Sequence, residues 1–203
     1  MTEEEARAWL LGCYGAAKIA SLEQFVDLLL AENRIQNLIG KASEGQVWVR
    51  HILDSAQIER LAPEVESWLD VGSGPGLPGL VLAIVTGKPI LLVEPRRRRV
   101  EFLEAVKQAL GLDNATVQQT TIERVKGQTF GAVTARAFAP LPELFASTIQ
   151  LTDPSTIWVL PKGRSAEREL EAARGSWQGV FHVKQSLTDD DARIIVARGV
   201  RPR

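Results

Sequence analysis

Residues 69–79 read LDVGSGPGLPG, and this stretch decides the fold. An apolar run, SWLDV (67–71), precedes it, and an apolar stretch of helical length, PGLVLAIVTG (78–87), follows it. A strand, a glycine-rich turn and a helix in this order present unpaired backbone N–H groups and the positive end of a helix to a ligand. The stretch therefore predicts the start of an α/β domain that binds a cofactor.

Short apolar runs alternate with helical stretches from this loop to the C-terminus. Strands are expected at 67–71, 89–94, 115–120, 131–136, 155–160, 179–183 and 192–197, and helices at 78–87, 96–111, 141–148 and 165–174. Such alternation predicts a mainly parallel, seven-stranded sheet with helices on both faces. The last two strands have no convincing helix between them, so we expect a terminal antiparallel hairpin at the sheet edge.

The segment before the glycine loop has a different pattern. Apolar residues recur at helical spacing through roughly the first 62 residues, up to Pro63. Thr2 with Glu5, and Ser21 with Gln24, have the spacing of capping boxes and predict two helix starts. The sequence thus predicts an N-terminal helical extension (1–62) and a cofactor-binding domain (63–203), which together form one compact unit.

Composition excludes several classes of protein. The 203 residues carry 24 basic and 25 acidic side chains, so any nucleic-acid surface must be a local basic patch. Cys13 is the only cysteine, which rules out an intrachain disulfide and disfavours a zinc site built on thiolates; no metal is expected. We find neither a secretion signal nor a stretch of roughly 20 apolar residues, so the expected location is the cytoplasm, with no membrane contact.

The glycine loop fits two cofactors. Counted from Gly74 it is the G-x-G-x-x-G of a dinucleotide site, and counted from Asp70 it is the D-x-G-x-G-x-G of an S-adenosylmethionine site. Glu94 ends the next strand, 20 residues after Gly74, where an acid accepts hydrogen bonds from ribose hydroxyls. Both cofactors carry a ribose, so Glu94 does not choose between them.

Two features favour S-adenosylmethionine. Pro75 and Pro78 have no N–H to offer a pyrophosphate, and Asp70 would repel one, whereas it can orient a cationic amino-acid group. The sole tyrosine, Tyr14, lies in the N-terminal helices, so the tyrosine acid of a short-chain dehydrogenase is missing. A small NAD-dependent dehydrogenase is the weaker alternative.

Six segments in order resemble one known family. They are NRIQNLIG (33–40), VRHILDS (49–55), DVGSGPGLPGL (70–80), RRRVEFLEAV (97–106), TARAFAPL (134–141) and LPKG (160–163). Together they are similar to segments of the bacterial small-subunit rRNA guanine-N7 methyltransferases, the RsmG or GidB family. The resemblance implies a Rossmann-like class I methyltransferase fold, S-adenosylmethionine as methyl donor and 16S rRNA of the small ribosomal subunit as substrate. We expect a monomer.

The resemblance also implies cofactor contacts at matching positions: Gly72, Leu77, Ile122, Glu123 and Arg136. Glu94 stands where this class places its ribose-binding acid, and the loop pattern adds Asp70 and Gly74 to the expected cofactor site. Guanine N7 carries a lone pair and no proton. Its attack on a sulfonium methyl group therefore requires no general base, and no catalytic side chain is expected.

Basic residues at three places are candidates for RNA binding. They are Arg50 and His51 in the VRHILDS segment, Arg96 and Arg97 in the first turn of a helix, and Lys162 and Arg164 after the fifth strand. Cations in the first turn oppose the helix dipole, which argues against a purely stabilising role, although a solvated helix face is an equally good explanation. A ribosome-assembly or RNA-binding factor with a vestigial cofactor site remains a second hypothesis.

Overall fold

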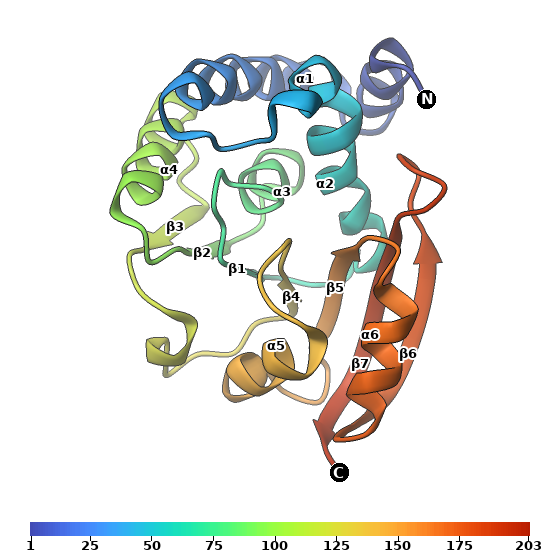
Figure 1. Cartoon of the computed structure of the whole chain (residues 1–203). Coiled ribbons are helices and arrows are strands. Elements are labelled where there is room, and N and C mark those ends of the chain that lie inside the picture. Colours follow the sequence, from blue (N-terminus) through green and yellow to red (C-terminus); the bar gives the residue numbers. More distant parts are fainter.

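A seven-stranded sheet crosses the middle of the protein in the computed structural model, which describes residues 1–203 (Figure 1). The strand order is β3-β2-β1-β4-β5-β7-β6. The strands are β1 (Trp68–Val71), β2 (Ile90–Val93), β3 (Ala115–Gln118), β4 (Ala132–Thr134), β5 (Ile157–Lys162), β6 (Trp177–Gln185) and β7 (Arg193–Pro202). The first five are parallel, and β7 runs antiparallel to both β5 and β6. The predicted sheet and its terminal hairpin are confirmed.

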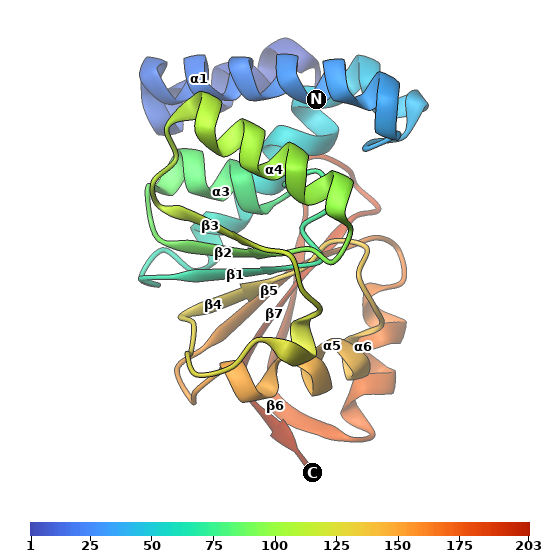
Figure 2. The same cartoon turned by 90° about the vertical axis from the view of Figure 1, so that its left-hand side faces the viewer.

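Helices cover both faces of this sheet, as Figure 2 shows. One face carries α3 (Gly79–Thr86) and α4 (Arg97–Leu110), with α1 (Glu3–Gln36) lying across them and α2 (Asp54–Ala56) beside α3. The other face carries α5 (Leu141–Thr148) and α6 (Ala166–Arg174). The short helical turns are η1 (Lys41–Gln46), η2 (Trp48–Leu53), η3 (Gln57–Leu61), η4 (Ile122–Arg124) and η5 (Ile149–Leu151). None of these helices has the length and apolar character needed to cross a membrane.

The topology fixes where a ligand can bind. The chain passes from β1 to β2 on one side and later returns to β4 on the other side of β1. Connections on opposite sides of β1 leave a crevice beyond the carboxyl ends of β1 and β4, which is where open α/β sheets bind ligands. Since β1 and β2 are buried along their whole length, only the loops at that edge are available for binding.

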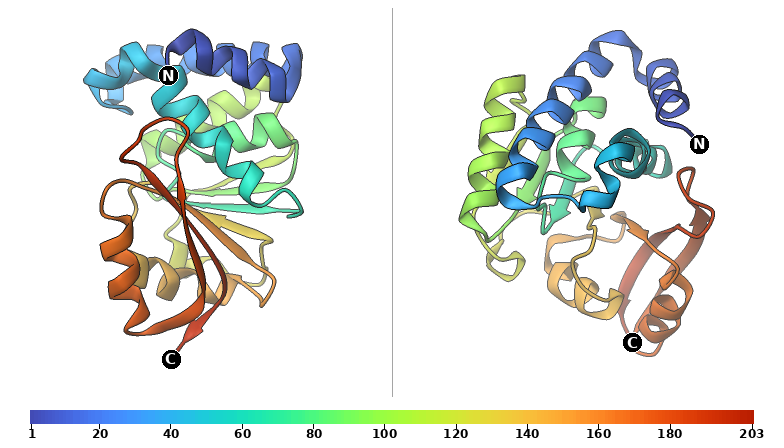
Figure 3. Two further views of the ribbon diagram at one scale, coloured as in Figure 1. Left: turned by 90° about the vertical axis from the view of Figure 1, so that its right-hand side faces the viewer. Right: turned by 45° about the horizontal axis from the view of Figure 1, so that its top comes forward.

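The N-terminal helix departs from the prediction in one respect. The first capping box forms, because the Glu5 N–H donates to Thr2 Oγ1 at 3.1 Å and the Thr2 N–H to Glu5 Oε2 at 2.7 Å. The second predicted box, at Ser21 with Gln24, is wrong: α1 continues through Ser21. The break lies instead at Gly15 (Figure 3). Its φ of 80° is a conformation that glycine adopts easily because it has no Cβ.

The helical extension shares its core with the rest of the chain. Phe25 and Leu29 of α1 belong to the same cluster of 38 buried apolar residues as Leu80 of α3 and Phe102 of α4. A second cluster of 22 residues fills the opposite face of the sheet. The predicted division after residue 62 therefore separates two parts of the sequence that pack around one core.

This shared core predicts that residues 1–62 unfold together with the sheet. Phe25 is fully buried, so Phe25→Ala should lower the free energy of unfolding by about 3–5 kcal/mol. Ile35→Ala on the same helix, where the side chain is 62% exposed, should change it by less than about 0.5 kcal/mol. Urea unfolding followed by circular dichroism and by tryptophan fluorescence should give one coincident transition. Two separated transitions would contradict the shared core.

Candidate functional site

The glycine loop is fastened to the end of β2. Gly72 and Ser73 both donate their N–H groups to the Val93 carbonyl, at 2.9 and 3.1 Å. Gly72, Gly74 and Gly76 have φ angles of 69°, 54° and 84°, a region that other residues adopt only with strain. The loop is therefore a backbone conformation that requires glycines, held at the ligand-binding edge of the sheet.

Glu94 is the side chain that closes this loop. Its carboxylate, 3% exposed, accepts the Gly74 N–H on Oε2 and the Arg96 N–H on Oε1, both at 2.9 Å. The Arg99 guanidinium lies 4.0 Å from Oε2. An ionised carboxylate has about four acceptor sites, so two remain for further donors. Glu94 thus fits the expected role of binding ribose hydroxyls while it holds the loop.

Asp70 lies beneath the loop rather than above it. Its side chain is fully buried, Oδ2 accepts the Gly79 N–H at 3.1 Å, and Oδ1 has no hydrogen-bond partner. Burial raises the pKa of Asp70 to about 7. A Cβ on Gly79 would lie only 2.4 Å from Asp70 Oδ2 and 2.2 Å from the Leu92 side chain. This close packing explains why residue 79 is a glycine, and no pyrophosphate is needed to account for it. A direct contact of Asp70 with the methyl donor stays a prediction.

Leu77 in the loop, and Ile122 and Glu123 in η4, are further residues expected to contact the cofactor. Leu77 and Ile122 are almost completely buried, each in one of the two apolar clusters. Glu123, the next residue of η4, is exposed. Because the Ile122 side chain is buried in the core, only its backbone and the Glu123 side chain can contact a ligand. Their contacts with a cofactor stay predictions.

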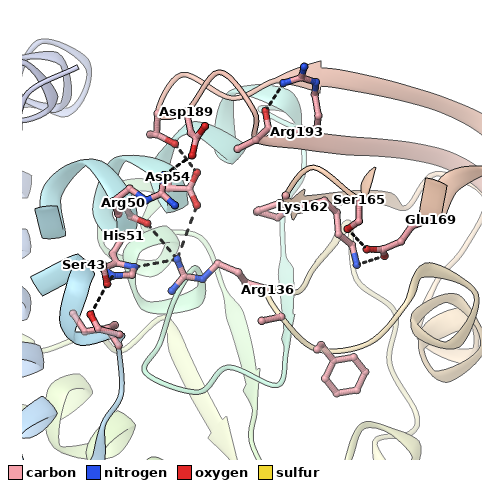
Figure 4. Close-up of a pocket in the computed structure, with 18 of the residues that line it drawn as sticks. Ser43, Arg50, His51, Asp54, Arg136, Lys162, Ser165, Glu169, Asp189 and Arg193 are labelled. Carbon is pink, nitrogen blue, oxygen red and sulfur yellow. Dashed lines mark hydrogen bonds and ion pairs between the residues drawn. The ribbon is translucent and has the colours of Figure 1, made fainter. Parts of the chain in front are cut away.

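Arg136 follows β4 and is held by the helical extension (Figure 4). Its Nη1 donates to His51 Nδ1 at 3.2 Å and to the Arg50 carbonyl at 3.4 Å, and it lies 3.9 Å from Asp54 Oδ2. An arginine can only donate, so His51 Nδ1 must be the acceptor. The proton of the His51 ring therefore resides on Nε2, which lies 2.8 Å from Ser43 Oγ.

His51 is consequently neutral. Burial, followed by the charges of Arg136 and Arg50, lowers the pKa of His51 to about 4. A buried ring with both nitrogens bonded has no atom free for a phosphate. We therefore expect His51 to influence RNA binding through Arg136.

A polar network ties the extension to the tip of the β6–β7 hairpin. Asp54 Oδ1 accepts from Thr188 Oγ1 and from Gln57 Nε2, each at 2.9 Å, and the Leu187 N–H donates to Gln57 Oε1 at 2.8 Å. Arg50 and Asp189 form an ion pair at 2.5 Å across 139 residues of sequence. Burial raises the pKa of Asp54, and the charge of Arg136 opposes that rise. The network closes one wall of a cavity.

This cavity of about 890 Å³ lies between the extension and the loops at the carboxyl edge of the sheet. Five segments line it: the extension between Leu38 and Asp54, the loop after β4, the end of β5 with the loop after it, the first turn of α6, and the hairpin tip with the start of β7. Its charged side chains are Arg50, Asp54, Arg136, Lys162, Arg168, Glu169, Asp189 and Arg193. Figure 4 shows two groups of them, Arg50, Asp54, Arg136 and Asp189 on one side and Lys162 with Glu169 on the other.

The predicted RNA-binding residues fall into separate groups. Arg50, His51 and Lys162 line the cavity. Arg164 lies outside it, fully on the surface, and forms an ion pair with Asp191. Arg96 and Arg97 precede and begin α4, on the other side of the glycine loop, and are not part of the cavity wall. The structure thus brings together three of the six candidates.

The cavity residues that are absent from the predicted site include Asp54, Phe138, Arg168 and Arg193. Asp54 and Phe138 lie inside segments that resemble the family, VRHILDS and TARAFAPL, so their motifs offered a signal. Arg168 sits in a charged helix and Arg193 begins a strand. Nothing in their local sequence distinguishes them from ordinary surface cations.

The neutral state of His51 predicts a pH dependence of stability. The unfolded chain binds a proton on this ring near the ordinary pKa of 6.5, whereas the folded chain binds it only near 4, so stability is lost as the pH falls between these values. Between pH 7.5 and 5.0 this amounts to about 2 kcal/mol. His51→Gln, which cannot titrate, should lose that much less on the same change, measured by urea unfolding. Parallel pH profiles for the two proteins would show that His51 is not buried as neutral imidazole.

Solved structures of low sequence identity share the fold. An O-methyltransferase from Bacillus cereus in complex with SAH has a TM-score of 0.59 and 13% identity, covering 86% of this chain and 90% of that chain. TYW2 of M. jannaschii in complex with AdoMet has a TM-score of 0.59 and 12% identity, covering 75% and 76%. These likenesses confirm the predicted class I methyltransferase fold, and S-adenosylmethionine agrees with it as the expected cofactor.

The sequence comparisons are more specific. A protein of Erythrobacter litoralis named ribosomal RNA small subunit methyltransferase G is 46% identical over 200 residues, covering 98% of this chain and 97% of the relative. A protein of that name from Sphingopyxis alaskensis is 46% identical over 201 residues, covering 97% and 86%. The family model described as rRNA small subunit methyltransferase G matches residues 18–194. With its glycine loop, its fold and these relatives, the chain belongs to the rRNA small subunit methyltransferase G (GidB) family.

Proposed function

We propose that this protein transfers a methyl group from S-adenosylmethionine to N7 of a guanine in 16S rRNA, and that guanine 527 is the target. The names of the relatives support ribosomal RNA of the small subunit as the substrate. The resemblance of six segments to guanine-N7 methyltransferases supports the finer assignment. Family membership also decides against the dehydrogenase alternative.

The position of the cavity is the observation that carries this proposal. The loop after β4 contributes Arg136 and Phe138 to the cavity wall, and the ring of Phe138 packs against Gly72 of the glycine loop. A Cβ placed on Gly72 would lie 2.7 Å from that ring. A substrate bound in the cavity would therefore lie beside the loop expected to hold the methyl donor.

The residues present fit such a donor. Glu94 has two acceptor sites left for ribose hydroxyls, and Gly72 and Gly74 leave the loop backbone open, with Phe138 next to Gly72 and the Arg99 guanidinium next to Gly74. Arg136 can pair with a carboxylate. Ile122, Glu123 and Asp70 complete the set expected from the sequence, as adenine contacts and as the acid beneath the loop.

The chemistry demands alignment rather than proton transfer. When bound, the donor supplies an electrophilic methyl group on a positively charged sulfur, and guanine N7 attacks it with a free lone pair. The protein then has to bring the two atoms together and exclude water. This agrees with a cavity whose acids, Asp54, Glu169 and Asp189, are all engaged by cations.

For RNA binding we propose Arg50, Lys162 and Arg164 near the cavity, with Arg96 and Arg97 on the far side of the loop. The base must be unstacked to enter a cavity of this size, which favours a loop of the RNA over a helix. We further propose that the protein acts as a monomer in the cytoplasm.

The direct test maps N7-methylguanosine in 16S rRNA by mass spectrometry. RNA from cells that lack this protein should lose one such modification, and expression of this chain should restore it. Restoration at a different base, or a full set of modifications without the protein, would refute the assignment.

Two variants should abolish methylation while the chain stays folded. Gly72→Asp puts a charged side chain into the loop expected to hold the donor, at a φ of 69°, and Arg136→Ala removes the cation that can pair with a carboxylate; each should reduce turnover more than 100-fold. Arg201→Ala, on an exposed arginine at the far end of β7, is the matched control and should remain active. Circular dichroism at the assay temperature checks folding. Wild-type turnover by both folded variants would eliminate this cofactor site.

Calorimetry separates an enzyme from a binding factor with a vestigial site. Titration of S-adenosylmethionine into the wild-type protein should release heat with one site per chain. Absence of binding by a protein that still binds 16S rRNA would favour the ribosome-assembly hypothesis.

A further inference from the structure

Phe138 is an aromatic ring exposed in a cavity whose wall carries eight charged side chains. Its side chain is 41% exposed, one of the few large apolar side chains in contact with solvent. Apart from the imidazole of His51, no other aromatic ring lines the cavity. An apolar ring exposed to solvent does not gain the free energy of removing its surface from water. Such an exposed ring is typical of a site where a ligand covers it.

The backbone holds this ring in place at a cost. Ala137, immediately before it, has a φ of 52°, a left-handed conformation that costs a residue with a Cβ about 1–2 kcal/mol. One edge of the ring packs against Gly72, and the ring also lines the cavity. Phe138 therefore lies where the glycine loop and the cavity meet.

The charges of the cavity complement a phosphodiester backbone. Three ion pairs neutralise Arg50 with Asp189, Arg136 with Asp54 and Lys162 with Glu169. Two further cations, Arg168 and Arg193, line the cavity without a carboxylate partner; Arg193 donates only to the carbonyl groups of Asp190 and Ala192. The lining has five cationic side chains against three carboxylates, so the cavity carries a net excess of positive charge.

We propose that the cavity binds one unstacked nucleotide of the RNA, with its base stacked on Phe138 and neighbouring phosphates on Arg168 and Arg193. The inference rests on the proposed methyltransferase function and names the residues that receive the target base. A volume of about 890 Å³ suits a single nucleotide and not a helix. Stacking on an aromatic ring compensates for the lost stacking in the RNA, and it would hold N7 next to the glycine loop.

The test compares substitutions that separate stacking from simple filling of space. Phe138→Ala removes the ring, Phe138→Leu keeps an apolar side chain without a π face, and Phe138→Tyr keeps the ring. Val180→Ala, an exposed apolar residue on β6 outside the cavity, is the matched control. For each protein we would measure kcat/KM for small subunits lacking the modification, the affinity for S-adenosylmethionine by calorimetry, and the midpoint of thermal unfolding.

Stacking on one base is worth about 1–3 kcal/mol, which corresponds to a factor of about 5–150. Phe138→Ala and Phe138→Leu should lower kcat/KM by that factor, whereas Phe138→Tyr and the control should stay within about twofold of the wild-type value. Affinity for S-adenosylmethionine should change less than about twofold in all four.

Two results would overturn the inference and leave the proposed function intact. Full activity of Phe138→Leu would show that an apolar wall suffices. A loss of donor affinity as large as the loss of kcat/KM would show that the ring serves the cofactor. Absence of methylation by the wild-type protein would instead remove the proposed function, and this inference with it.

The phosphate contacts have a separate readout in the salt dependence of RNA binding. Each phosphate contact to a single strand contributes about 0.7 to the slope of log K against log salt concentration. Arg168→Ala and Arg193→Ala should each reduce the slope by roughly that amount, and Arg201→Ala should leave it unchanged. An unchanged slope in the first two variants would remove these cations from the binding site.

Discussion

The pairing of Arg136 with the helical extension is the interaction on which the site depends. A guanidinium largely withdrawn from water needs acceptors, because an unpaired buried charge costs several kcal/mol. Here the acceptors come from the extension: His51 Nδ1, the Arg50 carbonyl and Asp54. Arg136 itself belongs to the end of β4. One cation therefore fixes how the N-terminal segment lies over the ligand-binding edge of the sheet.

The same constraint spreads to the hairpin. Asp54 uses one oxygen towards Arg136 and the other towards Gln57 and Thr188, so the hairpin tip can dock only where the extension already lies. His51 in turn must be neutral so that Nδ1 can accept from Arg136. Its proton then lies on Nε2, and Ser43 Oγ is the partner of that nitrogen. Three distant segments, the extension, the end of β4 and the hairpin tip, thus hold one another in place through contacts that satisfy their buried polar groups.

Much of the fold and part of the site follow from local pattern. The seven strands and the helices from α3 onward were predictable because they have their own apolar patterns, and many of them are bounded by a glycine or proline. The start of α1 at Thr2 followed from its capping box, while the box at Ser21 misled because the shared core keeps the helix intact there and Gly15 supplies the break. Glu94 and the glycines were found because the loop requires them in fixed order.

By itself the sequence determined the fold, the family and the loop expected to hold the donor, since these depend on short-range spacing. Only the tertiary structure decided which of the basic residues meet in one cavity. Arg50 and Asp189 are 139 residues apart and form an ion pair, whereas Arg96, which shares the Glu94 carboxylate with the glycine loop, lies outside the cavity wall. Ion pairing and desolvation depend on distances in space, and those distances are set by how the extension, the strand ends and the hairpin pack together.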